Sequence, residues 1–186
     1  MRRVNSKRTL RTFILLDLRA RRREPSWRVV FHPVIRFQLA LRLYEYLLNT
    51  RQTRLAACFN LYFRSLSLKL GFSIPPNVFG PGLCIVHYGA IIVSPRAKVG
   101  RNCRLHAGVN IGGKAGFYEV AEADTLCPVI GPHCYIGPGA KIFGPIVLGP
   151  ACKIGANAVV TRSWPLGDCV LVGVPARPLR GAPDDE

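Results

Sequence analysis

Acidic residues are scarce in this chain of 186 residues, which has 10 Asp and Glu against 26 Lys and Arg. The shortage is greatest in residues 1–70, where 16 basic residues accompany only 3 acidic ones. The N-terminal third therefore supplies most of the net charge of +16. Such a region attracts polyanions, whether nucleic acid, an anionic membrane surface or a phosphorylated ligand, and charge alone does not choose among them.

Long apolar runs and paired cysteines are also missing. The longest uninterrupted apolar stretch near the N-terminus runs from Phe13 to Leu16. It is far shorter than a signal-peptide core or the roughly 20 residues that span a bilayer. The 7 cysteines form no CxxC pair and are odd in number, which favours a reducing compartment. We therefore expect a cytoplasmic, globular protein with no transmembrane segment.

The first part of the chain is helical in pattern. Between residues 28 and 71, apolar side chains recur at helical spacing and predict two amphipathic helices. These side chains are Val34, Phe37, Leu41, Tyr44, Leu48, Leu55, Phe59, Phe63, Leu66 and Leu70. Pro33 suits the first turn of one helix, and Gly71 suits the end of the other.

After Gly71 the helical spacing gives way to a period of six. The repeat has a two-residue insertion and one polar interruption, and every anchor is a large apolar residue. The eleven anchors are Phe79, Ile85, Ile91, Val99, Leu105, Ile111, Ile130, Ile136, Ile142, Leu148 and Ile154. Glycine follows seven of them. Three hexads of this kind make one triangular coil, so stacked coils should form a solenoid of parallel strands around a narrow apolar interior.

Small residues occupy the fifth place of several hexads and should also point inward. They are Cys103, Val109, Cys134, Ala140, Cys152 and Ala158. Buried free cysteine behaves as a small apolar residue, so packing accounts for several of the cysteines. The period by itself does not distinguish a transferase from a solenoid without chemistry.

Segments from Ile85 to Arg180 resemble the serine O-acetyltransferase family of hexapeptide-repeat acyltransferases. In order, they read IVHYGAIIV (85–93), GVNIGGKAG (108–116), CPVIGPHCYIGPGAKIFGPIVLG (127–149), KIGANAVVT (153–161) and VGVPARPLR (172–180). The resemblance implies an all-β, left-handed parallel β-helix with an N-terminal helical region. It also implies a homotrimer that binds acetyl-CoA between neighbouring subunits, with no metal.

The resemblance also predicts the boundaries of the regions of the chain and the roles of individual residues. We expect a basic helical region at 1–71, a β-helix at 72–174 with an extruded loop at about 114–127, and a tail at 175–186. Transfer of an acetyl group to an alcohol needs a base, and His87 lies in the matching segment. His32, His106 and His133 have no such support and are expected to be structural.

Other site residues are also implied by the resemblance. Backbone N–H groups at Gly112 and Gly113 would stabilise the oxyanion. Ala140, Lys153 and Ala156 would lie along the CoA groove, with Lys153 near its phosphates. The acidic residue of an Arg-Asp-Pro segment in the family appears here as Glu24, which makes Glu24 a candidate for binding the acceptor.

The chain departs from the serine family around the acceptor. Val86 replaces an aspartate beside the base, and Leu126 and Cys127 replace an Arg-His pair. A serine zwitterion would find few charged partners there. The segment beginning at Cys127 looks instead like colanic-acid and exopolysaccharide acetyltransferases, so Cys127 is a second candidate for acceptor binding. Because no basic residue flanks Cys127, a nucleophilic role for it is disfavoured.

We therefore expect an O-acetyltransferase that acts on a sugar hydroxyl in exopolysaccharide synthesis. Serine O-acetylation for cysteine synthesis and a trimeric scaffold without catalysis remain alternatives. The basic N-terminal region could meet the anionic inner face of the membrane. Nucleic acid is not expected as a partner, because no helix-turn-helix or aromatic stacking pattern is present.

Overall fold

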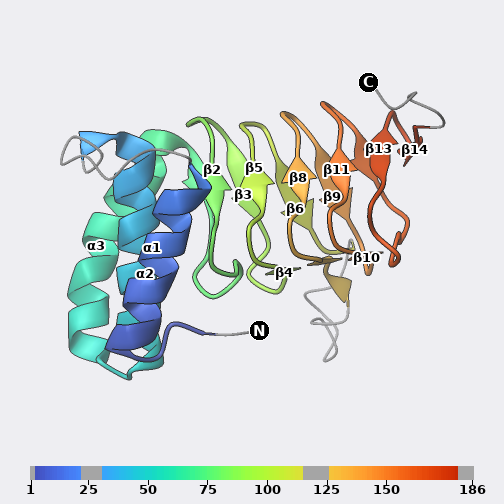
Figure 1. Ribbon diagram of the computed structural model, residues 1–186. Helices are drawn as coiled ribbons and strands as arrows, with labels where there is room; N and C mark the ends of the chain where they lie inside the picture. Colours follow the sequence, from blue (N-terminus) through green and yellow to red (C-terminus); the bar gives the residue numbers. More distant parts are fainter. Residues whose placement is uncertain (1–2, 22–30, 115–125, 180–186) are drawn as a thin grey trace.

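Three helices stand at one end of a triangular prism of short strands (Figure 1). The computed structural model describes residues 3–21, 31–114 and 126–179. The helices are α1 (Lys7–Ala20), α2 (Pro33–Asn49) and α3 (Thr53–Leu70). The last strands, at the C-terminal end of the described chain, lie at the end of the prism farthest from the helices (Figure 1).

The prism is built from strands of two or three residues each. They are β1 (Phe72–Ser73), β2 (Cys84–Ile85), β3 (Ile91–Val93), β4 (Lys98–Val99), β5 (Arg104–Leu105), β6 (Asn110–Gly112), β7 (Val129–Ile130), β8 (Tyr135–Ile136), β9 (Lys141–Phe143), β10 (Val147–Leu148), β11 (Lys153–Ile154), β12 (Val159–Val160), β13 (Val170–Val172) and β14 (Arg177–Pro178). Such short strands are expected where the chain turns a corner every six residues.

Each face of the prism is one sheet, in which strands from successive coils stack in register. The first face has the order β1-β3-β6-β9-β12, the second β10-β7-β4 and the third β14-β13-β11-β8-β5-β2. All pairings between these strands are parallel except that of β13 with β14. On the third face Ile85 pairs with Leu105, which pairs with Ile136, so the anchors of the repeat stack upon one another.

The anchors fill the interior as the repeat predicts. All eleven, from Phe79 to Ile154, are at most 2% exposed. The small residues of the fifth place, Cys103, Val109, Cys134, Ala140, Cys152 and Ala158, are equally buried. Large and small residues therefore share a narrow interior, which confirms the inward-facing positions inferred from the sequence.

Four cysteines stack at one corner of the prism, in successive coils. Cys103, Cys134 and Cys152 are buried, and Cys169 is half-buried at the far end of the column. The Cys169 Sγ lies 3.4 Å from the Cys152 Sγ. Burial, followed by the hydrogen bond with Cys169, raises the pKa of Cys152 to about 12. The buried cysteines of the column therefore pack the corner as small apolar side chains.

The glycines after the anchors allow successive coils to approach closely. A Cβ added at Gly131 would lie 2.5 Å from the backbone carbon of Gly149, and one at Gly100 would lie 2.6 Å from the nitrogen of Pro132. These contacts are with backbone atoms, which cannot rotate away. Glycine is thus required here by the spacing of the coils.

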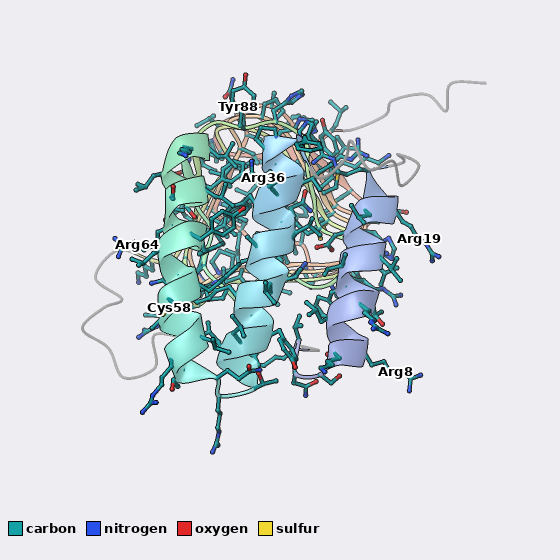
Figure 2. All side chains as sticks on the ribbon, turned by 90° about the vertical axis from the view of Figure 1, so that its left-hand side faces the viewer. Arg8, Arg19, Arg36, Cys58, Arg64 and Tyr88 are labelled. Carbon is teal, nitrogen blue, oxygen red and sulfur yellow. The ribbon has the colours of Figure 1, made fainter. Side chains whose placement is uncertain are left out.

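The helices cover the open end of the first coil in a single layer. Figure 2 views this layer from outside, with α2 between α1 and α3. Pro33 begins α2 and Gly71 ends α3 in the left-handed conformation, with φ of 72°, as the sequence predicts. The side chains of Leu48 and Leu55, by contrast, are 38% and 58% exposed, because they flank the turn between the helices rather than the core.

The helix α1 was not among the two helices predicted from the sequence. Ser6 caps it through a reciprocal box with Thr9, and Phe13 and Asp17 are its buried residues. The helices and the prism share one continuous apolar core, in which Phe37 contacts Phe63 and Phe72 at ring-centroid distances of 5.3 Å and 4.9 Å. Among the described helices, none is long and apolar enough to cross a membrane.

Candidate functional site

His87 lies at a corner of the first coil, two residues after the anchor Ile85 and before β3 begins. Its side chain is exposed, as is that of Tyr88, whereas Val86 is half-buried. The Val86 N–H donates to the Leu105 carbonyl at 2.9 Å, so the backbone just before His87 is tied to the next coil. The imidazole is thus presented to solvent from a fixed backbone.

A second histidine stacks directly beyond His87 at the same corner. The ring centroids of His87 and His106 are 6.2 Å apart, and those of His106 and Tyr135 are 5.0 Å apart. The three rings come from consecutive coils, since β2, β5 and β8 are neighbours in one sheet. We predicted a structural role for His106 from the sequence alone, but the structure places it beside the proposed base. His106 follows the anchor Leu105 directly and His87 lies two residues after the anchor Ile85, so their places near the same corner were the signal that could have revealed this pair.

The environment of His106 favours its neutral form. Burial lowers the pKa of His106, and the neighbouring His87 and Arg104 lower it further. Its Nε2 is buried and makes no hydrogen bond with the described residues. Of the two histidine rings at this corner, that of His87 is the one exposed to solvent.

A buried charged network holds the first coil against the helices. The Asp17 carboxylate accepts from Arg42 Nε at 2.8 Å and from the backbone N–H groups of Gly82 and Leu83 at 2.7 Å and 2.9 Å. Burial raises the pKa of Asp17, while Arg42 and the two amides oppose that shift. Arg42 also donates to Glu45 at 2.9 Å, so the three charged side chains compensate one another.

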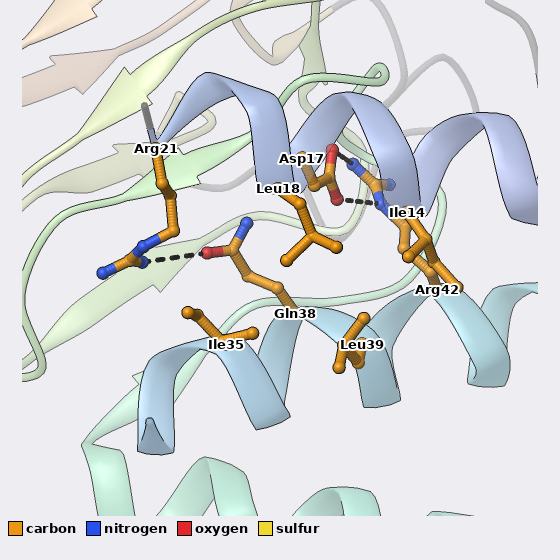
Figure 3. Close-up of a pocket in the computed structure, with 8 residues that line it drawn as sticks. All are labelled: Ile14, Asp17, Leu18, Arg21, Ile35, Gln38, Leu39 and Arg42. Carbon is orange, nitrogen blue, oxygen red and sulfur yellow. Dashed lines mark hydrogen bonds and ion pairs between the residues drawn. The ribbon is translucent and has the colours of Figure 1, made fainter. Parts of the chain in front are cut away.

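Other members of the network bond the backbone closer to His87. The Gln38 amide donates to the Leu83 carbonyl at 2.6 Å, and Arg21 Nη1 donates to the Ile85 carbonyl at 2.5 Å. Arg21 Nη1 also donates to the Gln38 side-chain oxygen at 3.3 Å, a contact seen in Figure 3. The cavity drawn there, between α1 and α2, has a volume of about 10 Å³ and is too small for a substrate. Its residues therefore act on the fold rather than on a ligand.

The glycines expected to stabilise the oxyanion lie at a different corner. Gly112 ends β6, and Gly113 follows it, at the corner where the chain leaves the first face. His87 lies at the corner where the chain enters that face, between β2 and β3. A Cβ at Gly112 would lie 2.3 Å from the Phe143 ring, so packing of that ring also requires glycine. Within one protomer the structure does not bring His87 together with Gly112 and Gly113.

The residues expected along the CoA groove divide into two groups. Ala156 and Lys153 are exposed on the third face and its adjoining corner, the corner that also carries His87. Ala140, in contrast, is completely buried, and its N–H and carbonyl are bonded to Gly137 and Asn110. Ala140 therefore offers no surface to a cofactor, and our assignment of it to the groove is corrected: it is one of the small core residues.

The proposed acceptor residues also need revision. Cys127 is 2% exposed and its thiol lies 3.5 Å from the Ser94 hydroxyl, so it is buried outside the core of the prism and presents no surface to an acceptor. Leu126 packs against it, and the Leu126 carbonyl accepts from the Lys114 N–H at 3.1 Å, which closes the base of the loop. Glu24, and residues 115–125 of the predicted loop, lie outside the described residues.

Parallel strands stacked with a period of six, around an aliphatic interior and under a helical cap, define a hexapeptide-repeat β-helix. Residues 127–162 match the family model for bacterial transferase hexapeptide repeats, described as "Bacterial transferase hexapeptide (six repeats)". This match falls on the part of the prism that runs from β7 to β12.

The chain is similar to serine acetyltransferases in both sequence and structure. It is 32% identical over 127 residues to that of Synechococcus elongatus, an alignment that covers 68% of this chain and 50% of the relative. The soybean enzyme complexed with serine superposes with a TM-score of 0.75 at 28% identity, covering 93% of this chain and 70% of that one. A serine acetyltransferase in complex with CoA gives 0.74 at 26% identity, covering 93% and 71%.

This chain spans about half the length of the curated relative from Synechococcus elongatus. The repeat family and the structural neighbours imply that the β-helix is left-handed and preceded by a helical region, as the sequence resemblance suggested. The relatives named here are serine acetyltransferases and lend no support to the exopolysaccharide branch.

Proposed function

We propose that this protein is an acetyl-CoA-dependent O-acetyltransferase with His87 as general base. The observation that carries the proposal is the exposed imidazole at the corner of a transferase-type hexapeptide repeat, in a chain similar to an enzyme solved with CoA. His87 takes the proton of the acceptor hydroxyl as its oxygen attacks the thioester carbonyl. The C–S bond then breaks, and the imidazolium returns the proton to the departing CoA thiolate.

The acceptor that the comparisons favour is serine. The relatives named above carry the name serine acetyltransferase, and the soybean enzyme was solved with serine bound. This supports the serine alternative over the sugar acceptor expected from Val86, Leu126 and Cys127. The burial of Cys127 further weakens the sugar hypothesis, because one of the residues that motivated it has almost no exposed surface.

Release of CoA thiol from acetyl-CoA tests both the activity and the acceptor. We expect thiol release to depend on L-serine and to be absent with matched concentrations of monosaccharides and oligosaccharides. Thiol release that depends on a sugar and not on L-serine would identify the sugar as the acceptor. No release with any acceptor would leave the scaffold alternative in place and would refute the transferase.

We further propose that the active unit is a homotrimer. His87 and the Gly112–Gly113 pair lie at different corners of one prism, so a site that uses both must combine two protomers. Closed threefold symmetry supplies three identical junctions of this kind. Acetyl-CoA would lie at such a junction, with Lys153 and Ala156 exposed beside the corner that carries His87.

The helical layer is proposed to meet an anionic membrane surface. Its described acidic residues, Asp17 and Glu45, are both buried beside Arg42, whereas Arg8, Arg19, Arg36 and Arg64 are exposed (Figure 2). The exposed charge of the described helices is therefore positive throughout, which anionic headgroups attract. Sedimentation with phosphatidylglycerol vesicles should carry the protein down, and equal sedimentation with neutral vesicles would contradict this.

A further inference from the structure

The first coil of a solenoid has no coil before it, so one edge of its strands lacks backbone partners. Here, side chains of α1 and α2 bond that edge. Asp17 accepts from the N–H groups of Gly82 and Leu83, and Gln38 donates to the Leu83 carbonyl. Arg21 continues the series by donating to the carbonyl of Ile85 at the end of β2. These side chains take the place of the missing strand.

The turn that carries His87 is held on both sides by the helical layer. On its N-terminal side, Arg21 bonds the Ile85 carbonyl two residues before His87. On its C-terminal side, the Gly89 N–H donates at 2.9 Å to the carbonyl of Leu70, the last residue of α3. The path of the backbone through His87 is therefore set between Arg21 and the end of α3.

We infer that Arg21, oriented by Gln38, is a positioning residue for His87. This inference rests on the proposed function, because it assigns Arg21 a role through the base of that reaction. Arg21 itself contacts the backbone of β2 and the Gln38 amide, whereas the exposed imidazole lies further along the chain. One nitrogen, Nη1, donates to both partners, and the planar guanidinium fixes the directions of its N–H bonds, whereas those of a lysine ammonium rotate.

A change at Arg21 should affect turnover more than cofactor binding. Loss of the Ile85 anchor lets the turn shift, and a displacement of about 1 Å at a reacting group can cost roughly 100-fold in rate. We expect Arg21→Met to lower kcat about 10- to 100-fold, while the KM for acetyl-CoA changes by less than about twofold. Arg21→Lys, which keeps the charge and one donor nitrogen, should recover part of the loss.

Arg19→Met is the matched control. Arg19 lies in the last turn of the same helix, but its side chain is exposed and lies at the edge of α1 that faces away from α2 in Figure 2. We expect it to leave kcat unchanged. All variants are assayed well below their melting temperatures, and far-UV circular dichroism checks that they are folded. Wild-type kcat in folded Arg21→Met, or an equal loss in Arg19→Met, would overturn the inference.

A second measurement separates this inference from the proposed function. The His87 imidazole resonances in a ¹H–¹⁵N spectrum, assigned by their absence in His87→Ala, should shift or broaden in Arg21→Met and Arg21→Lys but not in Arg19→Met. If wild-type protein releases no thiol while the spectra change as expected, the transferase proposal fails and the positioning contact stands. If the spectra do not change, the positioning role fails whatever the activity. Should Arg21→Met not fold, Arg21→Lys decides by the same criteria.

Discussion

His87 and His133 are both exposed histidines at corners of the prism, which makes them a natural pair for testing the base. His87 follows β2 and adjoins His106, whereas His133 sits in the turn between β7 and β8 with φ of 63°. The two histidines have different neighbours but are both exposed. A difference in activity between their variants would therefore come from the position of His87 in the site, and not from the loss of any surface histidine.

We predict that His87→Ala lowers kcat by at least about 100-fold, the contribution usual for general base catalysis. His133→Ala should stay within about twofold of wild type. Thiol release from acetyl-CoA at saturating acceptor measures both. A scaffold would give variants that behave alike, and an active His87→Ala enzyme would remove His87 from the mechanism.

His106 should make stability sensitive to mild acid. Because the folded state lowers its pKa, the unfolded chain takes up the proton first as the pH falls below about 6.5. Its contribution is thus fully present above that pH and is lost as the pH falls through the lower folded-state pKa. We predict that the melting temperature of His106→Gln falls less between pH 7.5 and 5 than that of wild type. His133→Gln should match wild type, and the same slope for all three would contradict the prediction.

The helical layer and the first coil depend on each other at the level of whole elements. Side chains of α1 and α2 bond the free edge of the coil, and the C-terminal end of α3 bonds the turn after His87. Solenoids need such caps because an exposed strand edge leaves backbone groups unpaired. The α-helical region is therefore part of the folding unit of the prism.

This dependence predicts the effect of Asp17→Asn. The substitution is nearly isosteric, but it removes the charge that faces Arg42 at 2.8 Å. Arg42 keeps its ion pair with Glu45 at 2.9 Å, so the loss should stay below the roughly 3–5 kcal/mol typical of a buried charge left without a partner. We expect the free energy of unfolding in urea to fall by about 1–3 kcal/mol, the cost of losing hydrogen bonds to a charged group. Asn5→Ala, an exposed change before α1, is the control, and similar stability of both variants would refute the role of the network.

In the whole molecule, one prism keeps two parts of the proposed site apart. His87 and Gly113 lie on different corners, and the buried Ala140 and Cys127 offer no ligand surface between them. If the proposed site uses both corners, a neighbouring protomer must present the second one. The proposal therefore makes activity depend on the oligomeric state.

We predict a particle of three times 20.5 kDa in solution. Size-exclusion chromatography with light scattering measures this mass directly. Dilution that dissociates the particle should abolish thiol release, because protomers alone lack half of each site. A fully active monomer would contradict the shared site.

The prism could be predicted from the six-residue repeat alone. Each hexad requires one large apolar residue to point inward, so the repeat is enough to identify every anchor from Phe79 to Ile154, and all of them are buried. Gly71 and Pro33 were likewise identified locally, because their backbone preferences act within one turn of helix. His87 was selected by family resemblance rather than by its surroundings.

The surroundings of that histidine became clear only from the folded chain. Asp17 bonds Leu83 across 66 positions, and Arg21 bonds Ile85 across 64, and neither spacing leaves a periodic trace in the sequence. Ala140 is a case in which a motif misled the prediction. The family motif assigned it to the CoA groove, but its burial shows that it packs the core. Periodicity captures contacts that repeat from coil to coil, whereas the helical cap bonds the prism once, at one end, through contacts that only the folded chain brings together.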